Sequence, residues 1–157
     1  MKIERCTKGT FSVIGKEGST DNGEGFIERL WDDANRHFHE VAALAKKDSH
    51  GNLLGIWGLM SDFSRAFSPW EQNFTKGLYL AGVEVQSESV APPGWIKWTV
   101  PAFEYLYIAV GSDRMQDFHA VLDYIKENDL ELAGAVHDFI CPEESGKPYM
   151  FFPIRKP

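Results

Sequence analysis

The chain has 157 residues, which is enough for one domain with a substantial apolar core, so it needs no disulfide or metal to hold it together. Hydrophobic residues at 43% and charged residues at 25% are ordinary globular values, which argue against disorder, and no apolar run is long enough to cross a bilayer. The net charge of −7, with no basic cluster larger than Lys46-Lys47 or the terminal Arg155-Lys156, argues against direct binding to nucleic acid.

The N-terminal residues 1–5 contain no apolar stretch of the kind found in signal peptides, so we expect a cytoplasmic protein. Cys6 and Cys141 are the only cysteines and lack metal-ligand spacing, and we expect both to be reduced thiols.

The first half of the chain predicts the order strand, helix, strand, strand. Residues 11–15 are β-type and end at a glycine, and the polar, glycine-rich stretch 16–25 predicts a loop. From residue 27 to residue 45, apolar side chains recur every three or four positions, which predicts one amphipathic helix. The apolar segments 53–60 and 78–85 predict two further strands.

Between these two strands, residues 61–77 have neither a helix nor a strand period, although a short helical turn on either side of Pro69 is compatible with the spacing of four aromatic residues. Loops of this length in a compact domain often serve as lids or binding segments. The corresponding stretch in the second half, 142–148, is shorter and contains no aromatic residue.

A proline- and glycine-containing linker, 89–94, leads to the second half, which predicts the same order of elements. Residues 95–100 and 103–110 are β-like, and Asp113 with Gln116 predicts a capping box at the start of a second amphipathic helix. Two paired strands, 134–140 and 149–154, complete the half.

Taken together, these elements predict an α+β fold made of tandem duplicated β-α-β-β units, with an antiparallel sheet and two long helices around a central groove. The first pseudo-repeat covers residues 10–88 and the second covers 95–155, within one domain of residues 1–157. Residues 53–59 can be laid over 132–138, although the identity between the halves is low. A ligand site is expected at the seam between the two units, where concave surfaces form.

Metal and phosphate chemistry find no support in the sequence. His37 and His39 are two residues apart on a predicted helix and point to different sides, so they cannot share a metal ion. Neither a phosphate-binding glycine loop nor a nucleophile elbow is present. We therefore predict no metal and no cofactor.

An acidic residue, Asp138, interrupts the apolar segment 135–141. Such an acid must be paired, exposed to water, or held in a pocket for a purpose. Strand alternation puts Val136, Asp138 and Ile140 on one face, and the overlay of the halves gives Trp57 and Leu59 the matching face of the first unit. A carboxylate facing an aromatic wall suits an aromatic or amphiphilic cation. The alternative is an edge strand with Asp138 in water.

The order and spacing of several short motifs resemble the GyrI-like small-molecule-binding domain, also called the AraC-type effector-binding domain. The matching segments are 11–15, 27–31, 79–85, 93–95, 137–140 and 152–154. The resemblance covers nearly the whole chain and implies a tandem pair of strand-helix-strand-strand units around a shared groove. It also implies a lipophilic, often cationic, small molecule as the ligand, and a standalone member without room for a DNA-binding helix-turn-helix.

The family often has Phe-Glu-any-Tyr where this chain has residues 137–140. Asp138 takes the place of the ligand-facing glutamate, and Ile140 replaces a tyrosine whose hydroxyl could assist catalysis. This departure weakens a hydrolase interpretation, although Tyr105 or Tyr107 could supply a phenol from a neighbouring strand.

We therefore expect a binding module for a lipophilic, aromatic and cationic small molecule, with no direct contact to nucleic acid or membrane. The expected ligand-binding residues fall into four groups. Asp138 would supply the counter-charge and Phe63 and Phe67 a mobile cover. The ring faces would come from Trp57, Trp70, Trp95, Trp98 and Tyr105, and the apolar neighbours are Leu59, Val136 and Ile140. One alternative is a hydrolase of cyclopropane-bearing genotoxic compounds, with Asp138 activating water in the same groove. Another is an inhibitor that binds a protein such as gyrase, for which the sequence offers no specific surface.

Overall fold

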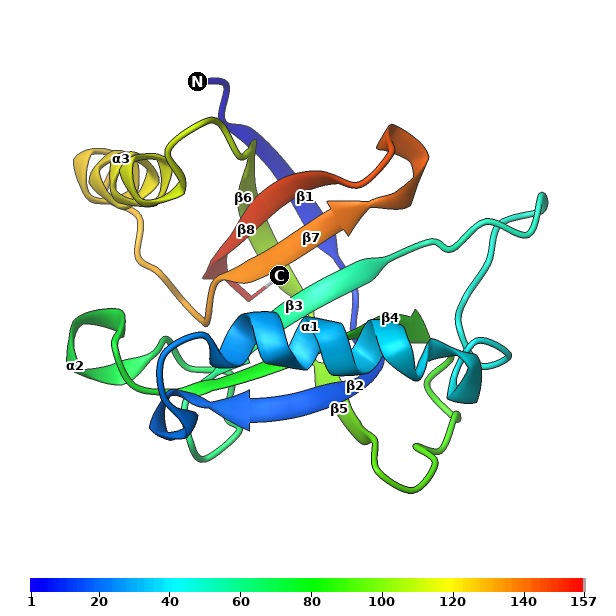
Figure 1. Cartoon of the computed structure of the whole chain (residues 1–157). Coiled ribbons are helices and arrows are strands. Elements are labelled where there is room, and N and C mark those ends of the chain that lie inside the picture. Colours follow the sequence, from blue (N-terminus) through cyan, green and yellow to red (C-terminus); the bar gives the residue numbers. More distant parts are fainter. Residues whose placement is uncertain (157) are drawn as a thin grey trace.

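One sheet of eight antiparallel strands, in the order β1-β6-β8-β7-β3-β4-β2-β5, organises the protein (Figure 1). The structure is a computed structural model and describes residues 1–156. The strands are β1 (Glu4–Lys8), β2 (Phe11–Ser19), β3 (Ile56–Ser61), β4 (Leu78–Val85), β5 (Ile96–Val100), β6 (Phe103–Ala109), β7 (His137–Cys141) and β8 (Lys147–Arg155). The predicted α+β class with an antiparallel sheet is confirmed.

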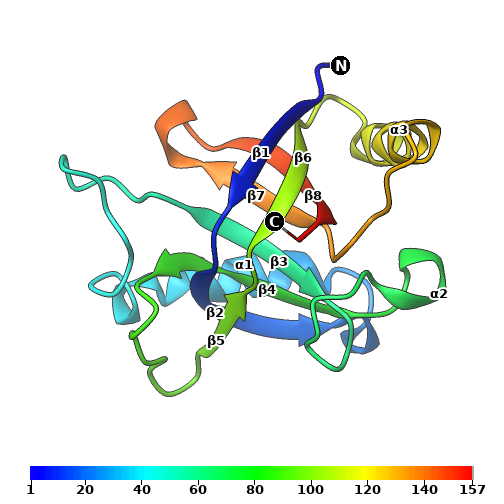
Figure 2. The same cartoon turned by 180° about the vertical axis from the view of Figure 1, so that it is seen from behind.

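The strand order reads alike from both edges of the sheet. β3 and β7 pair at the centre, β4 and β8 come next, β2 and β6 follow, and β5 and β1 form the edges. Figure 2 shows β1 beside β6 at one of these edges. This arrangement is the one that two β-α-β-β units would give, while the duplication and its boundaries stay predictions.

Each half of the sheet carries one helix on the same side. Helix α1 (Phe26–Arg36) packs on β2 and β4. Helix α3 (Arg114–Glu127) packs through Val121 and Ile125 onto apolar side chains of β6 and β8. Asp113 accepts a hydrogen bond from the backbone N–H of Gln116 at 3.0 Å, so the N-cap half of the predicted capping box is present. No helix among residues 1–156 is both long and apolar enough to span a bilayer.

The predicted extent of the first helix was wrong. The helix ends at Arg36, and a 3₁₀ turn (Phe38–Glu40) and an irregular segment follow. Further on, Ala45 bridges to Val85 and the Lys46 N–H donates to the carbonyl of Glu84 at 2.8 Å, so this segment pairs with β4 and cannot remain helical. The apolar residues that suggested a longer helix are instead buried by an irregular backbone, as Val41 shows at 0% exposure.

Other boundaries differ because strand pairing extends beyond the apolar residues. β2 continues through the polar residues 16–19, which pair with the start of β4, so the predicted loop 16–25 is shorter. β1 was not predicted, because its polar sequence pairs only along one edge. The short element α2 (Glu71–Phe74) lies in the segment 61–77, and its backbone is left-handed at Gln72 and Asn73.

The face of the sheet opposite the helices packs around a mainly aromatic core. Its buried members come from both halves and include Phe11, Trp57, Leu59, Phe67, Trp98, Phe103 and Tyr105. Much of the high aromatic content of the sequence is therefore used for packing.

Candidate functional site

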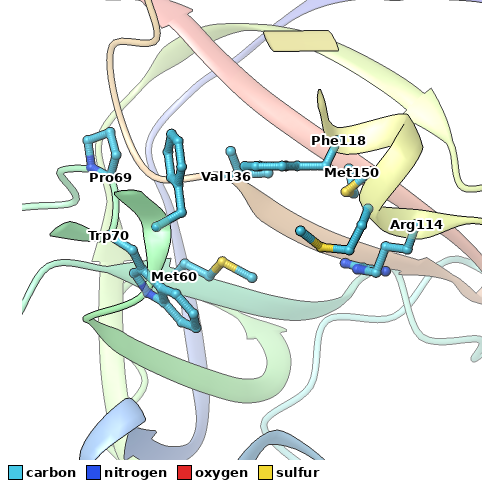
Figure 3. Close-up of a pocket in the computed structure, with 9 residues that line it drawn as sticks. Met60, Pro69, Trp70, Arg114, Phe118, Val136 and Met150 are labelled. Carbon is cyan, nitrogen blue, oxygen red and sulfur yellow. The ribbon is translucent and has the colours of Figure 1, made fainter. Parts of the chain in front are cut away.

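A small apolar cavity lies on the helix side of the sheet, between the start of α3 and the segment 61–77 (Figure 3). Its volume is about 130 Å³, and both halves of the chain contribute to it. The lining residues are Met60, Pro69, Trp70, Phe74, Arg114, Met115, Phe118, Val136 and Met150. Pro69 and Trp70 lie at one end of the pocket and Arg114 lies at the other.

Three of the four methionines of the chain meet in this cavity: Met60 from β3, Met115 from α3 and Met150 from β8. The thioether is flexible and polarisable, which lets a methionine-lined surface adapt to ligands of different shape. Phe74 lines the pocket and packs edge-to-face on Phe118, with ring centroids 5.2 Å apart. These methionines could not be singled out from the sequence, because Met60 and Met150 lie in apolar strand segments and Met115, which is 59% exposed, lies on an amphipathic helix.

A chain of polar side chains links the two halves next to the cavity. The indole N–H of Trp31 on α1 donates to the Tyr79 hydroxyl on β4 at 3.2 Å. That hydroxyl donates to Oδ2 of Asp138 on β7 at 2.9 Å. Arg114, the first residue of α3, forms an ion pair with the same carboxylate. Asp138 is only 9% exposed, so the predicted alternative of an acid in water is excluded by its burial.

Tyr79 reaches Asp138 by crossing over β3 at a glycine. Gly58 lies opposite Asp138 in the β3–β7 pairing and opposite Ala81 in the β3–β4 pairing. A Cβ at residue 58 would overlap the hydroxyl end of Tyr79 and would come within 3.2 Å of the Asp138 Cβ. Burial raises the pKa of Tyr79 to about 12, so the phenol remains a proton donor to the carboxylate at neutral pH.

Arg114 stands at an electrostatically unfavourable position, because a cation at the first turn of a helix opposes the helix dipole. Its side chain is 42% exposed, and its partial burial lowers the pKa, although arginine stays charged at neutral pH. Asp138 is its one ion-pair partner within residues 1–156. Arg114 was not among the predicted site residues. The one signal in the sequence was a basic residue directly after the helix cap Asp113, where the helix dipole disfavours a cation.

The structure brings three of the predicted ligand-binding residues to this site. Trp70 and Val136 line the cavity, and Asp138 forms an ion pair with Arg114, which also lines it. The Trp70 indole N–H donates to the carbonyl of Leu78 at 2.9 Å, which fixes one edge of the ring.

The predicted meeting of Trp57 with Asp138 was wrong. Trp57 lies directly opposite Phe139, and Gly58 lies opposite Asp138, so Trp57 and Asp138 project from different faces of the sheet. The Trp57 ring packs 4.6 Å from Phe139, and its N–H donates to the buried Glu84 at 3.0 Å. Leu59 shares the core face with Trp57 and is 0% exposed.

Most of the remaining predicted residues lie away from the cavity. Trp98 and Tyr105 are in the aromatic core, while Trp95 lines a separate cavity of about 120 Å³ under α1 and donates to Glu40 at 2.8 Å. Phe63 is 39% exposed, and Ile140 is half-buried near the end of β7.

Phe67 is not placed as a mobile cover. It is 9% exposed and packs on Trp98, and its N–H donates to the Ser61 hydroxyl at 2.9 Å. Asp62 accepts hydrogen bonds from the N–H groups of Ala66 and Ser68 at 3.0 and 3.3 Å. Residues 61–68 are therefore held in place, and the part of the segment that covers the cavity is 69–77.

The phenol beside Asp138 also differs from the one suggested by the sequence. Tyr79 supplies it, whereas Tyr105 lies on the opposite face, where its hydroxyl has no hydrogen-bond partner within residues 1–156. In the same part of the chain, no three His, Cys, Asp or Glu side chains gather as metal ligands.

No family model and no curated protein sequence matches this chain. Several solved structures, however, have a similar fold. SAV2435 bound to tetraphenylphosphonium has a TM-score of 0.63 and 17% identity, over 99% of this chain and 94% of that chain. The C-terminal domain of EcmrR has a TM-score of 0.62 and 12% identity, over 99% and 98%. An integron cassette protein from the mobile metagenome of Vibrio cholerae has a TM-score of 0.59 and 15% identity, over 98% and 95%. At these identities the similarity establishes a shared fold.

Proposed function

We propose that this chain is a GyrI-like binding module for lipophilic, aromatic and cationic small molecules, and that it takes them into the cavity beside Asp138. The observation that carries the proposal is the combination of an apolar, methionine-lined cavity with one buried carboxylate, Asp138, which pairs with the lining residue Arg114. The similarity in fold to SAV2435, a protein whose structure contains the lipophilic cation tetraphenylphosphonium, supports this ligand class.

A drug-sized ligand requires the cavity to enlarge. Pockets for such ligands usually measure roughly 300–1,000 Å³, whereas this cavity measures about 130 Å³. The residues 69–77 are the part of the lining most suited to move, because Gln72, Asn73 and Phe74 have φ angles of 50°, 59° and 64°. Non-glycine residues with positive φ are strained, so a change of backbone conformation in this segment on ligand binding would relieve part of that cost.

Asp138 would then supply the charge that distinguishes a cation from a neutral compound. It is held by Tyr79 in an orientation that does not depend on the ligand. The Trp70 ring at the other end of the cavity can place its face against a positively charged aromatic group.

Replacing Asp138 with Asn should weaken rhodamine 6G binding by roughly tenfold or more, because the ligand loses a buried counter-charge and meets an unpaired Arg114. Nile red, a neutral dye of similar size, should lose much less. Fluorescence polarisation of both dyes measures the two dissociation constants. Glu143→Gln, an exposed acid on the turn after β7, is the matched control and should change neither. An equal loss for both dyes would refute the charge argument, and failure of the wild-type protein to bind any member of a varied dye panel would refute the proposed function.

A further inference from the structure

We infer that Arg114 is an internal competitor of cationic ligands: it occupies Asp138 in the free protein and is displaced when a cation binds, so that it sets the charge selectivity of the groove. This inference rests on the proposed function and concerns the same site. Its starting point is that the two partners of Asp138 are held in very different ways.

Tyr79 is the fixed partner of Asp138. It is 1% exposed, it accepts a hydrogen bond from Trp31, and its phenol passes over Gly58 with no free space beside it. Any movement of the phenol away from Asp138 would disturb β3 and α1 together. This hydrogen bond should therefore persist when a ligand binds.

Arg114 is the replaceable partner. Almost half of its side chain is exposed, and it lies at the start of a helix, from which a long side chain can turn into solvent. Arg114 forms an ion pair with Oδ1 of Asp138, whereas Tyr79 donates to Oδ2, so the two partners occupy different oxygens of the carboxylate. Exchange of Arg114 for another cation keeps Oδ1 neutralised.

The same movement would change both the charge and the size of the site. Arg114 lines one end of the cavity (Figure 3) and pairs there with Asp138, so its departure adds volume beside the carboxylate. With Arg114 in place, the Arg114–Asp138 pair has no net charge and offers a cation no advantage over a neutral compound. Once Arg114 has left, the apolar walls surround an unpaired carboxylate, which favours a cation strongly and an anion not at all.

The test is Arg114→Gln, which keeps the first part of the aliphatic side chain and a polar end and removes the charge. We expect rhodamine 6G to bind about tenfold more tightly than to the wild-type protein, because no internal ion pair has to be broken. Nile red should bind within about twofold of wild type, and the anionic dye 8-anilinonaphthalene-1-sulfonate should not gain. Arg114→Lys retains a competing cation and should stay close to wild type for rhodamine 6G.

Two controls separate this mechanism from a general effect of charge or volume. Arg36→Gln removes the same charge from an exposed position at the end of α1 and should leave rhodamine 6G binding unchanged. In the double variant Arg114→Gln/Asp138→Asn, the gain in rhodamine 6G affinity should disappear. Thermal unfolding of each variant, followed by circular dichroism, verifies that it is folded.

Unchanged or weaker rhodamine 6G binding to Arg114→Gln would overturn the inference, as would an equal gain for Nile red, which would assign the effect to volume. If the wild-type protein bound the anionic dye and Arg114→Gln abolished that binding, Arg114 would be an anchor for anionic ligands. That result would also overturn the inference. In each of these cases dyes still bind, so the proposed function survives. Absence of binding to wild type and all variants refutes the proposed function itself.

Discussion

Lowering the pH from 6.5 to about 3 should destabilise this fold steeply, and replacing His137 with Asn should remove a large part of that loss. His137 is 0% exposed, and burial lowers its pKa from 6.5 to about 3. In the unfolded chain the imidazole has its ordinary pKa. Between these two values the unfolded state binds a proton that the folded state excludes. The free energy of unfolding therefore falls as the pH falls, by up to about 1.4 kcal/mol per pH unit from this residue.

The comparison is made by urea unfolding at several pH values between 7 and 3.5. Nδ1 of His137 accepts the backbone N–H of Met60 at 3.2 Å, and an asparagine Oδ1 can replace it as the acceptor. His119→Asn, an exposed residue on α3, serves as the control and should keep the wild-type slope. If His137→Asn and wild type lost stability in parallel, the buried imidazole would not be the cause of the acid sensitivity.

Segments whose burial matches their sequence pattern could be predicted well. The strand 78–85 was predicted with the bounds that the structure has, because all eight of its residues are buried and all but Gly82 and Glu84 are apolar or aromatic. The N-cap hydrogen bond of Asp113, one half of the predicted capping box, followed from local chemistry alone. Elements that depend on a distant partner were less predictable: β1 exists because β6 pairs with it, and α1 stops early because the chain that follows it pairs with β4.

The candidate site was predictable in part for the same reason. Asp138 stood out as an acid in an apolar strand, and it is indeed buried beside a cavity. The residue of β3 that neighbours Asp138 was predicted wrongly. The overlay of the halves aligned Leu59 with Asp138, whereas Gly58 lies opposite Asp138 in the sheet. A difference of one residue moves a side chain to the other face of a strand. Tyr79 and Arg114 meet Asp138 only through tertiary packing, which no local pattern reports.

Gly58→Ala should be among the most damaging single substitutions in the sheet, with a loss of about 2–5 kcal/mol in the free energy of unfolding. The added methyl group would overlap the phenol of Tyr79, whose buried ring has nowhere to retreat. Moving the ring would break its hydrogen bonds with Trp31 and Asp138 and leave both groups unpaired in the interior. Chemical unfolding measures the loss directly. Gly9→Ala is the matched control, because a Cβ there meets nothing within 4 Å, and it should cost little.

A double-mutant cycle separates this overlap from a general intolerance of alanine at residue 58. Leucine at position 79 ends short of the space that the added methyl group needs, so Gly58→Ala should cost much less in a Tyr79→Leu background, with a coupling energy of about 1–3 kcal/mol. Additive effects of the two substitutions would show that residue 58 acts independently of Tyr79. Strong coupling would show that the glycine is required so that a side chain of the first half can hold the carboxylate of the second. The geometry of the proposed ligand site would then depend on a residue that does not line the cavity.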